Sequence, residues 1–289
     1  MAGGLKEVRE RIASVQNTMQ ITSAMKMVSA AKLRRAQDAI TRMRPYAEKL
    51  QGVLANVSAT LDAAEGVYSV QRPVRKVLAV AVTSNRGLCG GFNNNILKAV
   101  RAYVVSNPDV HVEVLPLGKK AYDAYKRRDG EVAQGFAADA WKVFDALDFN
   151  RARAIADVVM ERYAAGEYDK VVVLYNRFVN AAVQSVTVED FLPLLPVQGG
   201  SSGGDYLFEP SKEEIVERVV PNSLRVQFYK ALLDSHASEH GARMTAMHQA
   251  TDNASELIRD LKISYNKARQ TAITTEILEI VAGSEALDG

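Results

Sequence analysis

Cysteine is almost absent from this sequence, which carries a single one, Cys89, among 289 residues. A lone cysteine excludes an internal disulfide bond and fits a reducing compartment. Long hydrophobic runs are also absent, because the plausible buried stretches, such as residues 77–82, are far shorter than the roughly 20 residues that span a bilayer. Residues 1–11 are polar and lack the apolar region of a signal peptide. We therefore expect a soluble protein that associates with a membrane only through partners.

Nucleotide-binding motifs are missing too, since neither G-x-G-x-x-G nor G-x-x-x-x-G-K-S/T occurs anywhere. The nearest feature is the turn at residues 86–91, Arg-Gly-Leu-Cys-Gly-Gly, between a predicted strand and a predicted helix, where backbone amides can cradle phosphate. A tight turn within the fold is the favoured interpretation over phosphate or dinucleotide binding. No histidine lies near Cys89 in the sequence to serve as its base, so a small buried thiol is favoured over a nucleophile. We expect no cofactor.

The first sixty residues carry an apolar seam at coiled-coil spacing. Its positions step alternately by three and four: Leu5, Val8, Ile12, Val15, Met19, Thr22, Lys26, Ser29, Leu33, Ala36, Ile40, Met43, Ala47, Leu50, Leu54, Val57 and Leu61. A helix over this span would be about 85 Å long. Pro45 falls inside it and predicts a bend. A lone helix of this length leaves its seam in water, so the pattern predicts a helical partner.

The other end of the chain offers that partner, because residues 223–283 contain no proline. A second seam of mostly small residues steps by four and three: Ala250, Ala254, Leu257, Leu261, Ser264, Ala268, Thr271, Thr275, Leu278 and Ala282. Small residues let two helices approach closely. We therefore predict a long antiparallel coiled coil of the N- and C-terminal helices, whose reach suits mechanical coupling or spacing better than catalysis in a compact enzyme.

Between the terminal helices the hydrophobic period changes. Strands are predicted at residues 77–82, 110–117, 171–175 and 184–191, and helices at residues 95–105, 119–128 and 150–165. Strands that alternate with helices predict a mainly parallel, Rossmann-like α/β domain inserted into the coiled coil. The predicted domains are residues 1–62, 70–208 and 211–289. The first and last are coiled-coil helices and the middle one is the α/β domain.

The connection to the C-terminal helix contains a glycine-serine run at residues 199–204, which predicts a surface loop. Ser211 followed by Glu214 has the form of a capping box, which predicts a short helix. Pro221 would end or kink that helix before the long one begins.

Charge is distributed unevenly. Residues 1–50 hold ten Lys or Arg against four Asp or Glu, whereas residues 270–289 hold four acidic residues and no basic one. A basic helix can bind nucleic acid, but these charges are interleaved with the seam and aromatic residues are nearly absent there. A solvated face, or one that faces a protein cavity, is favoured. At Thr22, Lys26 and Ser29 the seam turns polar or small while residues 25, 27 and 28 are apolar, which allows a second partner on another face.

A pattern of the form H-x-x-E-H occurs at residues 236–240. Histidines four apart lie on one helix face and can ligate zinc, with the glutamate as a base. A metalloenzyme built on His236 and His240 is therefore one alternative. The pattern lies in a helix whose expected role is pairing, which favours an ordinary structural use.

Several longer segments resemble the γ-subunit family of bacterial F-type ATP synthases, over essentially the whole chain. The segments at residues 21–37 and 86–91 resemble the family's N-terminal helix and central turn. Its C-terminal helix is matched at residues 250–254, Ala-Thr-Asp-Asn-Ala, at residues 265–270, Tyr-Asn-Lys-Ala-Arg-Gln, and at residues 273–279, Ile-Thr-Thr-Glu-Ile-Leu-Glu. Where the family usually has Gly-Ala, this chain has Gly283 and Ser284.

The resemblance implies a non-catalytic central rotor shaft. Its terminal helices would lie inside the hexameric ring of three α and three β subunits, and its globular part would lie with the ε subunit on the membrane-embedded ring of c subunits. Proton flow would turn the shaft and drive the β sites through different nucleotide affinities. The resemblance implies a peripheral location on the cytoplasmic side of a bacterial plasma membrane.

The resemblance also implies partner-binding residues. Met25 falls at the position that faces levers of the β subunit, and Arg269 with Gln270 at a pair that hydrogen-bonds a β-subunit loop. Tyr206 and Glu209 bound the segment that touches the c ring. The competing interpretation is a free-standing coiled-coil adaptor that binds nucleic acid or another protein, for which salt-sensitive DNA binding would be the sign.

Overall fold

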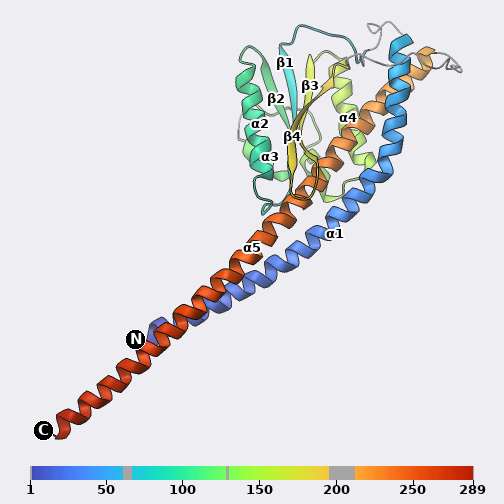
Figure 1. Ribbon diagram of the computed structural model, residues 1–289. Coiled ribbons are helices and arrows are strands. Elements are labelled where there is room, and N and C mark those ends of the chain that lie inside the picture. The colour runs from blue at the N-terminus through green and yellow to red at the C-terminus, as the bar shows by residue number, and fades with distance from the viewer. Residues whose placement is uncertain (1, 61–66, 128–129, 195–211, 289) are drawn as a thin grey trace. The chain divides into compact units, whose positions relative to one another are not determined.

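The structure of the chain is a computed structural model that describes residues 2–60, 67–127, 130–194 and 212–288. Its elements, labelled in Figure 1, are α1 (Ala2–Thr60), β1 (Lys76–Val82), α2 (Phe92–Ser106), β2 (His111–Leu117), α3 (Lys119–Tyr125), the 3₁₀ helix η1 (Ala140–Asp145), α4 (Phe149–Ala164), β3 (Lys170–Phe178), β4 (Gln184–Leu192) and α5 (Lys212–Asp288). The chain divides into two compact units, and the division cuts both long helices. One unit holds the residues up to Val28 and from Met244 onward, and the other runs from Ser29 to Arg243.

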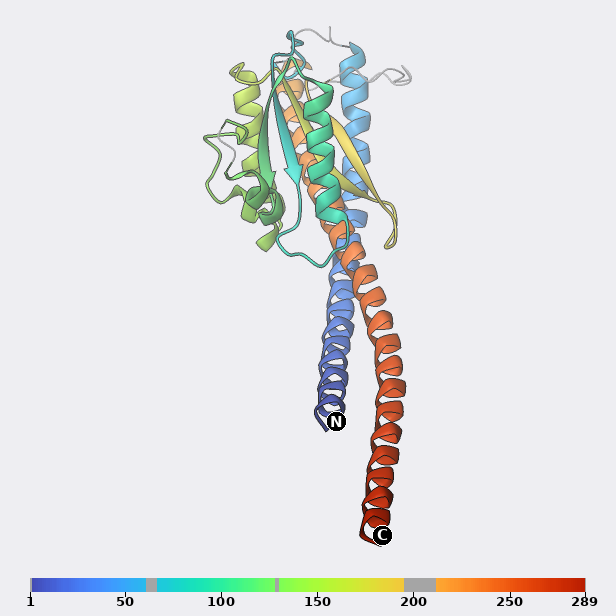
Figure 2. The ribbon, with the colours of Figure 1, turned by 90° about the vertical axis from the view of Figure 1, so that its left-hand side faces the viewer.

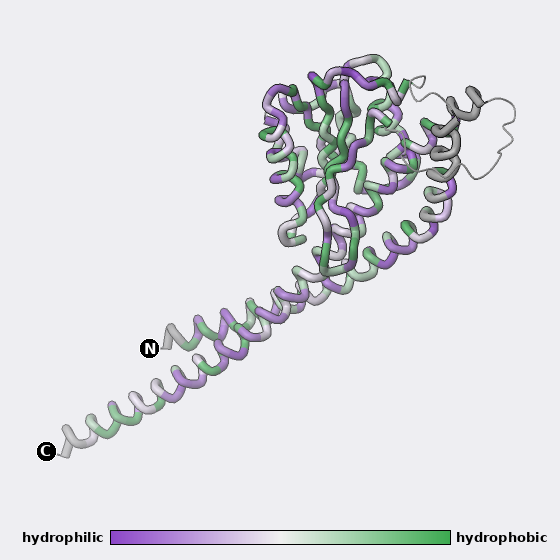
Figure 3. The backbone as a smooth tube through the Cα atoms, turned by 45° about the horizontal axis from the view of Figure 1, so that its top comes forward, coloured by the Kyte–Doolittle hydropathy of each residue, from purple (hydrophilic) through white to green (hydrophobic). Residues whose placement is uncertain are grey.

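The larger unit is built on a four-stranded sheet in the order β2-β1-β3-β4. β1 pairs with β2 and β3 in parallel, with Val80 opposite both Leu115 and Val173. β4 is antiparallel to β3, with Thr187 opposite Tyr175. The predicted mainly parallel sheet is confirmed. In Figure 3 the hydrophobic residues concentrate along these strands, as expected for strands covered on both faces.

Two hydrophobic clusters cover the two faces of the sheet. On one face Ile96 and Val100 of α2, with α3, pack on Val77 and Ala79 of β1. The other face carries α4, η1 and the first part of α5, whose fully buried residues on this face include Leu224, Phe228 and Leu232. Figure 2 shows α2 in front of the sheet and α5 behind it. α5 is thus both a coiled-coil helix and a core helix of the α/β domain.

In the smaller unit the two chain ends pair in antiparallel fashion. Arg9 of α1 meets Tyr265 of α5, and Thr22 meets Thr251. Every predicted seam position of α1 from Leu5 to Leu50, a range that continues past Val28 into the larger unit, is buried or half-buried, while the residues between them are mostly exposed. The predicted α1 seam is therefore confirmed over this range.

The predicted α5 seam is correct at Ala254 and Leu261 but wrong between them. Leu257 is 39% exposed whereas Ile258 is 8% exposed, and Tyr265, not Ser264, is the half-buried residue of the next step. Beyond Tyr265, the predicted seam residue Leu278 is 62% exposed. Leu257 and Ile258 are adjacent apolar residues, so the sequence pattern alone fits both registers. Tyr265 decides between them because it contacts Arg9.

Both prolines lie inside continuous helices. The predicted short helix before Pro221 is not separate, because α5 runs unbroken from Lys212 to Asp288. The buried residues that follow Pro221 hold the helix on the sheet, which outweighs the hydrogen bond that proline cannot make. α1 likewise continues past Pro45, and Figure 1 shows its axis turning in its second half.

The predicted strands and helices of the central domain are all present, with ends shifted by a few residues. α3 is shorter than predicted, since it ends at Tyr125, and η1 was not predicted from the sequence. The predicted loop at residues 199–204 and the capping residue Ser211 lie outside the described residues. The predicted domain boundaries remain predictions, because residues 62, 208 and 211 also lie outside the described residues.

Candidate partner-binding surfaces and buried polar cluster

The helix pair of the smaller unit is joined by specific polar contacts. Arg9 Nη2 donates to Tyr265 Oη at 3.1 Å, and the guanidinium carbon lies 5.9 Å from the centre of the Tyr265 ring. Thr22 Oγ1 and Thr251 Oγ1 lie 2.9 Å apart where the two helices meet. These contacts fix the register of the two helices and thereby the side chains that each leaves exposed.

α1 exposes apolar side chains away from its seam. Ile21, Met27 and Val28 are 60%, 66% and 57% exposed, while Met25 is half-buried. Exposed apolar residues this close together are typical of a surface that another protein covers. The predicted second partner on this face of α1 remains a prediction.

The C-terminal part of α5 extends past the start of α1. Arg9 lies opposite Tyr265, so Ala2, the first residue of α1, falls opposite about Ala272. Figure 2 shows the α5 ribbon continuing beyond the N-terminus. Its end is apolar and exposed, with 44–67% exposure at Ile273, Ile277, Leu278, Ile280 and Val281.

The predicted partner-binding residues do not form one site. Arg269 and Gln270 are exposed on α5 near the start of α1. Met25 lies opposite about His248, which is roughly 30 Å along α5 from Arg269 at 1.5 Å of rise per residue. Tyr206 and Glu209 lie outside the described residues. The residues with described positions are thus suited to separate contacts with partners.

In the larger unit, the turn at residues 86–91 packs against α5. Leu88 and Gly90 adopt positive φ angles of 61° and 58°. Arg243 of α5 donates from Nη2 to the carbonyl of Arg86 at 3.1 Å and from Nε to that of Gly87 at 3.3 Å. The carbonyl oxygens of Arg86 and Gly87 thus accept hydrogen bonds from the cationic guanidinium of Arg243. This contact supports the interpretation of residues 86–91 as a tight turn within the fold.

Arg243 is also half of a buried ion pair. Its Nη1 donates to Glu239 Oε1 at 2.7 Å, one helical turn away. Burial raises the pKa of Glu239 above its ordinary value, although the positive charge of Arg243 opposes this shift. Sequence reasoning did not single out this pair. The i, i+4 spacing of glutamate and arginine was the available signal, but that spacing is more often found on exposed helix faces.

His236 and His240 lie beside this pair, with their Nε2 atoms 3.2 Å apart. Burial lowers the pKa of His236 to about 4, and the charges of Lys32 and Arg243 add to the effect. Burial also lowers the pKa of His240 to about 3, with contributions from His236, Arg243 and Lys32. Both rings are therefore neutral at pH 7.

The surroundings of the histidine pair disfavour zinc. Glu239 already accepts a hydrogen bond from Arg243, and the positive charges of Lys32 and Arg243 would repel a divalent cation bound to the histidines. Within the described residues, no group of three His, Cys, Asp or Glu side chains could hold a metal ion. The histidine pair is better explained as a buried hydrogen-bonded contact, with His236 stacked on Phe144 at 6.1 Å between ring centres.

Cys89 is a buried thiol, as predicted. Asn93 Nδ2 lies 3.2 Å from its Sγ, and Ser84 Oγ lies 3.8 Å away. Burial raises the pKa of the thiol, although the hydrogen bond from Ser84 and the charge of Arg243 oppose this shift. A thiol with a raised pKa is a poor nucleophile.

The chain is similar to ATP synthase proteins over its full length. A family model described as ATP synthase matches residues 4–287. The ATP synthase gamma chains of Flavobacterium johnsoniae and Flavobacterium psychrophilum are 56% and 57% identical over 288 residues, covering 99% of each chain. That of a Geobacter species is 44% identical over 289 residues, with the same coverage.

The fold is also similar to that of chains in solved ATP synthase structures. A chain from the central stalk and c-ring of the Tetrahymena thermophila mitochondrial ATP synthase is 28% identical, with a TM-score of 0.59 over 80% of this chain and 99% of that one. A chain of the Euglena gracilis enzyme is 22% identical, with a TM-score of 0.66 over 99% and 95%, which shows the fold alone. Among the described helices, none is both long enough and apolar enough to cross a membrane.

Proposed function

Because this chain belongs to the family of ATP synthase γ chains, it is a central-stalk subunit, and we propose that it couples proton flow across a membrane to nucleotide binding in β subunits. Rotation of the stalk would present different faces of α1 and α5 to each β subunit in turn. The β subunits would then pass through states of different affinity for ADP, phosphate and ATP. Such coupling requires contacts that differ between the β states and no chemistry in the stalk.

The observation that carries this proposal is the exposed apolar end of α5. Beyond about Ala272, five large apolar side chains are 44–67% exposed in the described part of the chain, and apolar side chains this close together are typical of a surface that another protein covers. A surrounding ring of α and β subunits would supply that cover. The basic composition of residues 1–50 suits contact with acidic segments of β subunits.

The partner contacts follow from the family. Met25, half-buried on α1, faces the lever segments of a β subunit, and the exposed pair Arg269 and Gln270 hydrogen-bonds a β-subunit loop. Tyr206 and Glu209 contact the ring of c subunits, and the α/β domain also binds the ε subunit. The chain itself is not catalytic, in keeping with the absence of a P-loop motif from its sequence. It reaches the cytoplasmic side of the bacterial plasma membrane through these partners.

Reconstitution tests the proposal directly. This chain is mixed with separately folded α and β subunits, complexes are isolated by size, and their ATPase activity is measured. We expect a complex of three α subunits, three β subunits and one copy of this chain, with turnover that the chain alone lacks. Failure to associate would instead favour the coiled-coil adaptor.

A matched pair of variants separates the end of α5 from the rest of the chain. Leu278→Asp places a charge on the exposed apolar end, and Val105→Asp does the same on α2, where Val105 is 77% exposed. We expect Leu278→Asp to weaken assembly with the α and β subunits and Val105→Asp to leave it unchanged. Equal assembly of the two variants would contradict a role for the α5 end in ring binding.

A further inference from the structure

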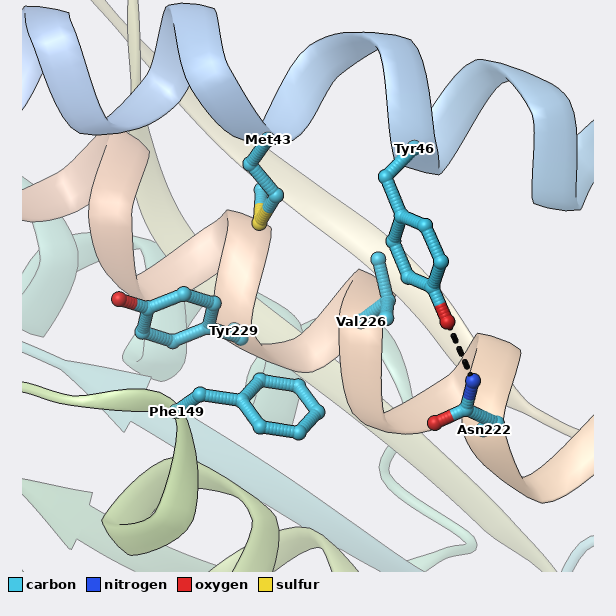
Figure 4. A pocket seen from close by; sticks show the side chains of 6 residues that line it. All are labelled: Met43, Tyr46, Phe149, Asn222, Val226 and Tyr229. Carbon is cyan, nitrogen blue, oxygen red and sulfur yellow. Dashed lines mark hydrogen bonds between the residues drawn. The ribbon is translucent and has the colours of Figure 1, made fainter.

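A cavity of about 320 Å³ lies between α1, α5 and the start of α4, within the unit from Ser29 to Arg243. Figure 4 shows Met43 and Tyr46 reaching down from α1 toward side chains of α5, with Phe149 approaching from α4. The residues that line it are Met43, Tyr46, Phe149, Asn222, Val226 and Tyr229. Tyr46 is 51% exposed, so the cavity can be reached from the surface.

The cavity lies where both long helices contain a proline. Pro45 directly precedes Tyr46 on α1, and Pro221 directly precedes Asn222 on α5. Each proline removes one backbone hydrogen bond and crowds the preceding turn, which loosens the helix locally. Asn222 Nδ2 donates to Tyr46 Oη at 2.6 Å and links the two helices at this level. The two helices are therefore joined by a polar contact beside a gap that their own side chains leave unfilled.

The lining determines the chemistry of a ligand. Phe149 and Tyr229 meet edge to face, with ring centres 5.6 Å apart and an angle of 83° between the ring planes. Met43 supplies a polarisable thioether, which contacts aromatic rings favourably. None of the described residues that line the cavity is Asp, Glu, Lys, Arg or His, so the lining offers no partner for a charged ligand. The Tyr46–Asn222 pair supplies polar atoms at one end.

The volume of the cavity indicates the size of a matching ligand. An apolar cavity of about 150 Å³ in a protein core holds one benzene molecule. This cavity has about twice that volume, and it lies at the lower end of the range for small-molecule sites. A molecule with two fused rings therefore matches the volume of the cavity.

We propose that this cavity is a binding site for a small neutral aromatic molecule that carries one hydroxyl group. Its rings would lie among Met43, Phe149 and Tyr229, and its hydroxyl would bond to the Tyr46–Asn222 pair. A bound molecule would contact α1, α4 and α5 together and brace the two long helices at their prolines. The site does not depend on the proposed rotary function, because all of its residues belong to this chain.

Methionine methyl NMR of the full chain, titrated with naphthol, tests the site. The Met43 resonance is assigned with a Met43→Leu variant. We expect a saturable shift of the Met43 methyl group, because an aromatic ring beside it changes its local field. Met27 is 66% exposed and lies in the other unit, so it reports non-specific association. An unmoved Met43, or a Met27 shift as large as that of Met43, would overturn the proposal.

Two variants locate the ligand within the cavity. Met43→Trp fills the space and is expected to lower naphthol affinity by at least about ten-fold, whereas Val105→Trp on the exposed face of α2 leaves it unchanged. Tyr46→Phe removes the hydroxyl and keeps the ring. Because this side chain is half exposed, we expect the variant to fold. It is expected to lower the affinity by about ten-fold, since one hydrogen bond is lost. Affinity unchanged in Tyr46→Phe, or in a folded Met43→Trp variant, contradicts the proposed binding mode.

Discussion

Arg243 and Glu239 form an ion pair at 2.7 Å in which both side chains are nearly inaccessible, at 8% and 9% exposure. The same guanidinium donates to the carbonyls of Arg86 and Gly87, so the pair lies where α5 meets the turn after β1. Removing one partner of a buried pair leaves an uncompensated charge, which costs far more than losing an exposed pair. The pair itself lies within α5, and Glu239 compensates the charge of the guanidinium that joins α5 to the turn.

We expect Glu239→Ala to lower the free energy of unfolding by about 3 kcal/mol, because Arg243 would stay buried without its carboxylate. Urea denaturation of the two proteins measures the change. Asp123→Ala serves as the control, since Asp123 pairs with Lys126 at a surface where the side chains are 37% and 39% exposed. The control should change stability by less than about 1 kcal/mol. Similar losses in both variants would contradict the importance of burial.

The histidine pair predicts a loss of stability in mild acid. The pKa values of His236 and His240 are lowered to about 4 and about 3 by burial, from an ordinary value of 6.5. Between pH 6.5 and 4 the unfolded chain therefore binds more protons than the folded one at these sites, and the free energy of unfolding falls as the pH falls. The expected loss is on the order of a few kcal/mol.

The double variant His236→Leu/His240→Gln should remove most of this pH dependence, measured as unfolding free energy at several pH values. Glu239, whose pKa is raised by burial, contributes in the opposite direction but is present in both proteins. His248→Gln is the control, because His248 is 56% exposed and pairs with Asp252 on the surface. The same pH slope in the double variant as in the wild type would rule out the buried pair as its source.

Gly118 is required by a close approach of two backbone segments. Its φ angle is 99°, and a Cβ atom there would collide with the carbonyl oxygen of Thr83. We expect Gly118→Ala to lower the melting temperature markedly, with a cost of about 3 kcal/mol or more, because backbone must move as well as adopt a strained angle. Gly130→Ala is the matched control. Gly130 has a φ angle of 81°, but no described atom lies within 4 Å of the place that an added Cβ would take, so strain alone should cost about 1 kcal/mol.

Arg269→Ala tests the proposed contact with a β-subunit loop. Arg269 is exposed on α5, so its replacement should change the free energy of unfolding by less than about 0.5 kcal/mol. In the assembled enzyme, we expect proton pumping driven by ATP to fall relative to ATP hydrolysis. Unchanged pumping would remove this residue from the coupling mechanism.

Met25→Lys tests the face of α1 that is proposed to meet the β levers. Met25 is half-buried, and a lysine can keep its charge in water while its stem replaces the methionine, so the helix pair should persist. The added charge alters the contact with the β subunit, and we expect lower ATP synthesis at a given proton gradient. Val105→Lys on α2 is the control for charge alone, and wild-type synthesis by Met25→Lys would refute this role.

Local patterns were sufficient for most of the fold. The alternating steps that include Leu33 and Ala36 identified the buried face of α1, since both residues are nearly inaccessible. The pattern could not choose between Leu257 and Ile258 on α5, because that choice depends on Tyr265 meeting Arg9 from the far end of the sequence. The low helix propensity of proline also led to a wrong helix end at Pro221. Packing of the residues that follow it outweighs the one hydrogen bond that proline cannot make.

Less of the candidate sites could be predicted from the sequence. Arg269 and Gln270 came from resemblance to a family, and exposure on a helix is all that the structure adds to them. The ion pair of Glu239 with Arg243 and the cavity beside Tyr46 depend on contacts between segments far apart in the chain. No periodicity in a single segment encodes such contacts, so they emerge only from the fold.

The unpaired end of α5 has a consequence for elasticity. Up to about Ala272 two helices share any twisting load, since polar contacts such as that between Arg9 and Tyr265 resist their sliding past each other. Beyond that point a single helix carries the load through its backbone hydrogen bonds alone, and its torsional stiffness is lower. The end of α5 therefore behaves as a compliant spring in series with a stiffer shaft. Under a steady torque, the helix would twist most per residue in these last turns.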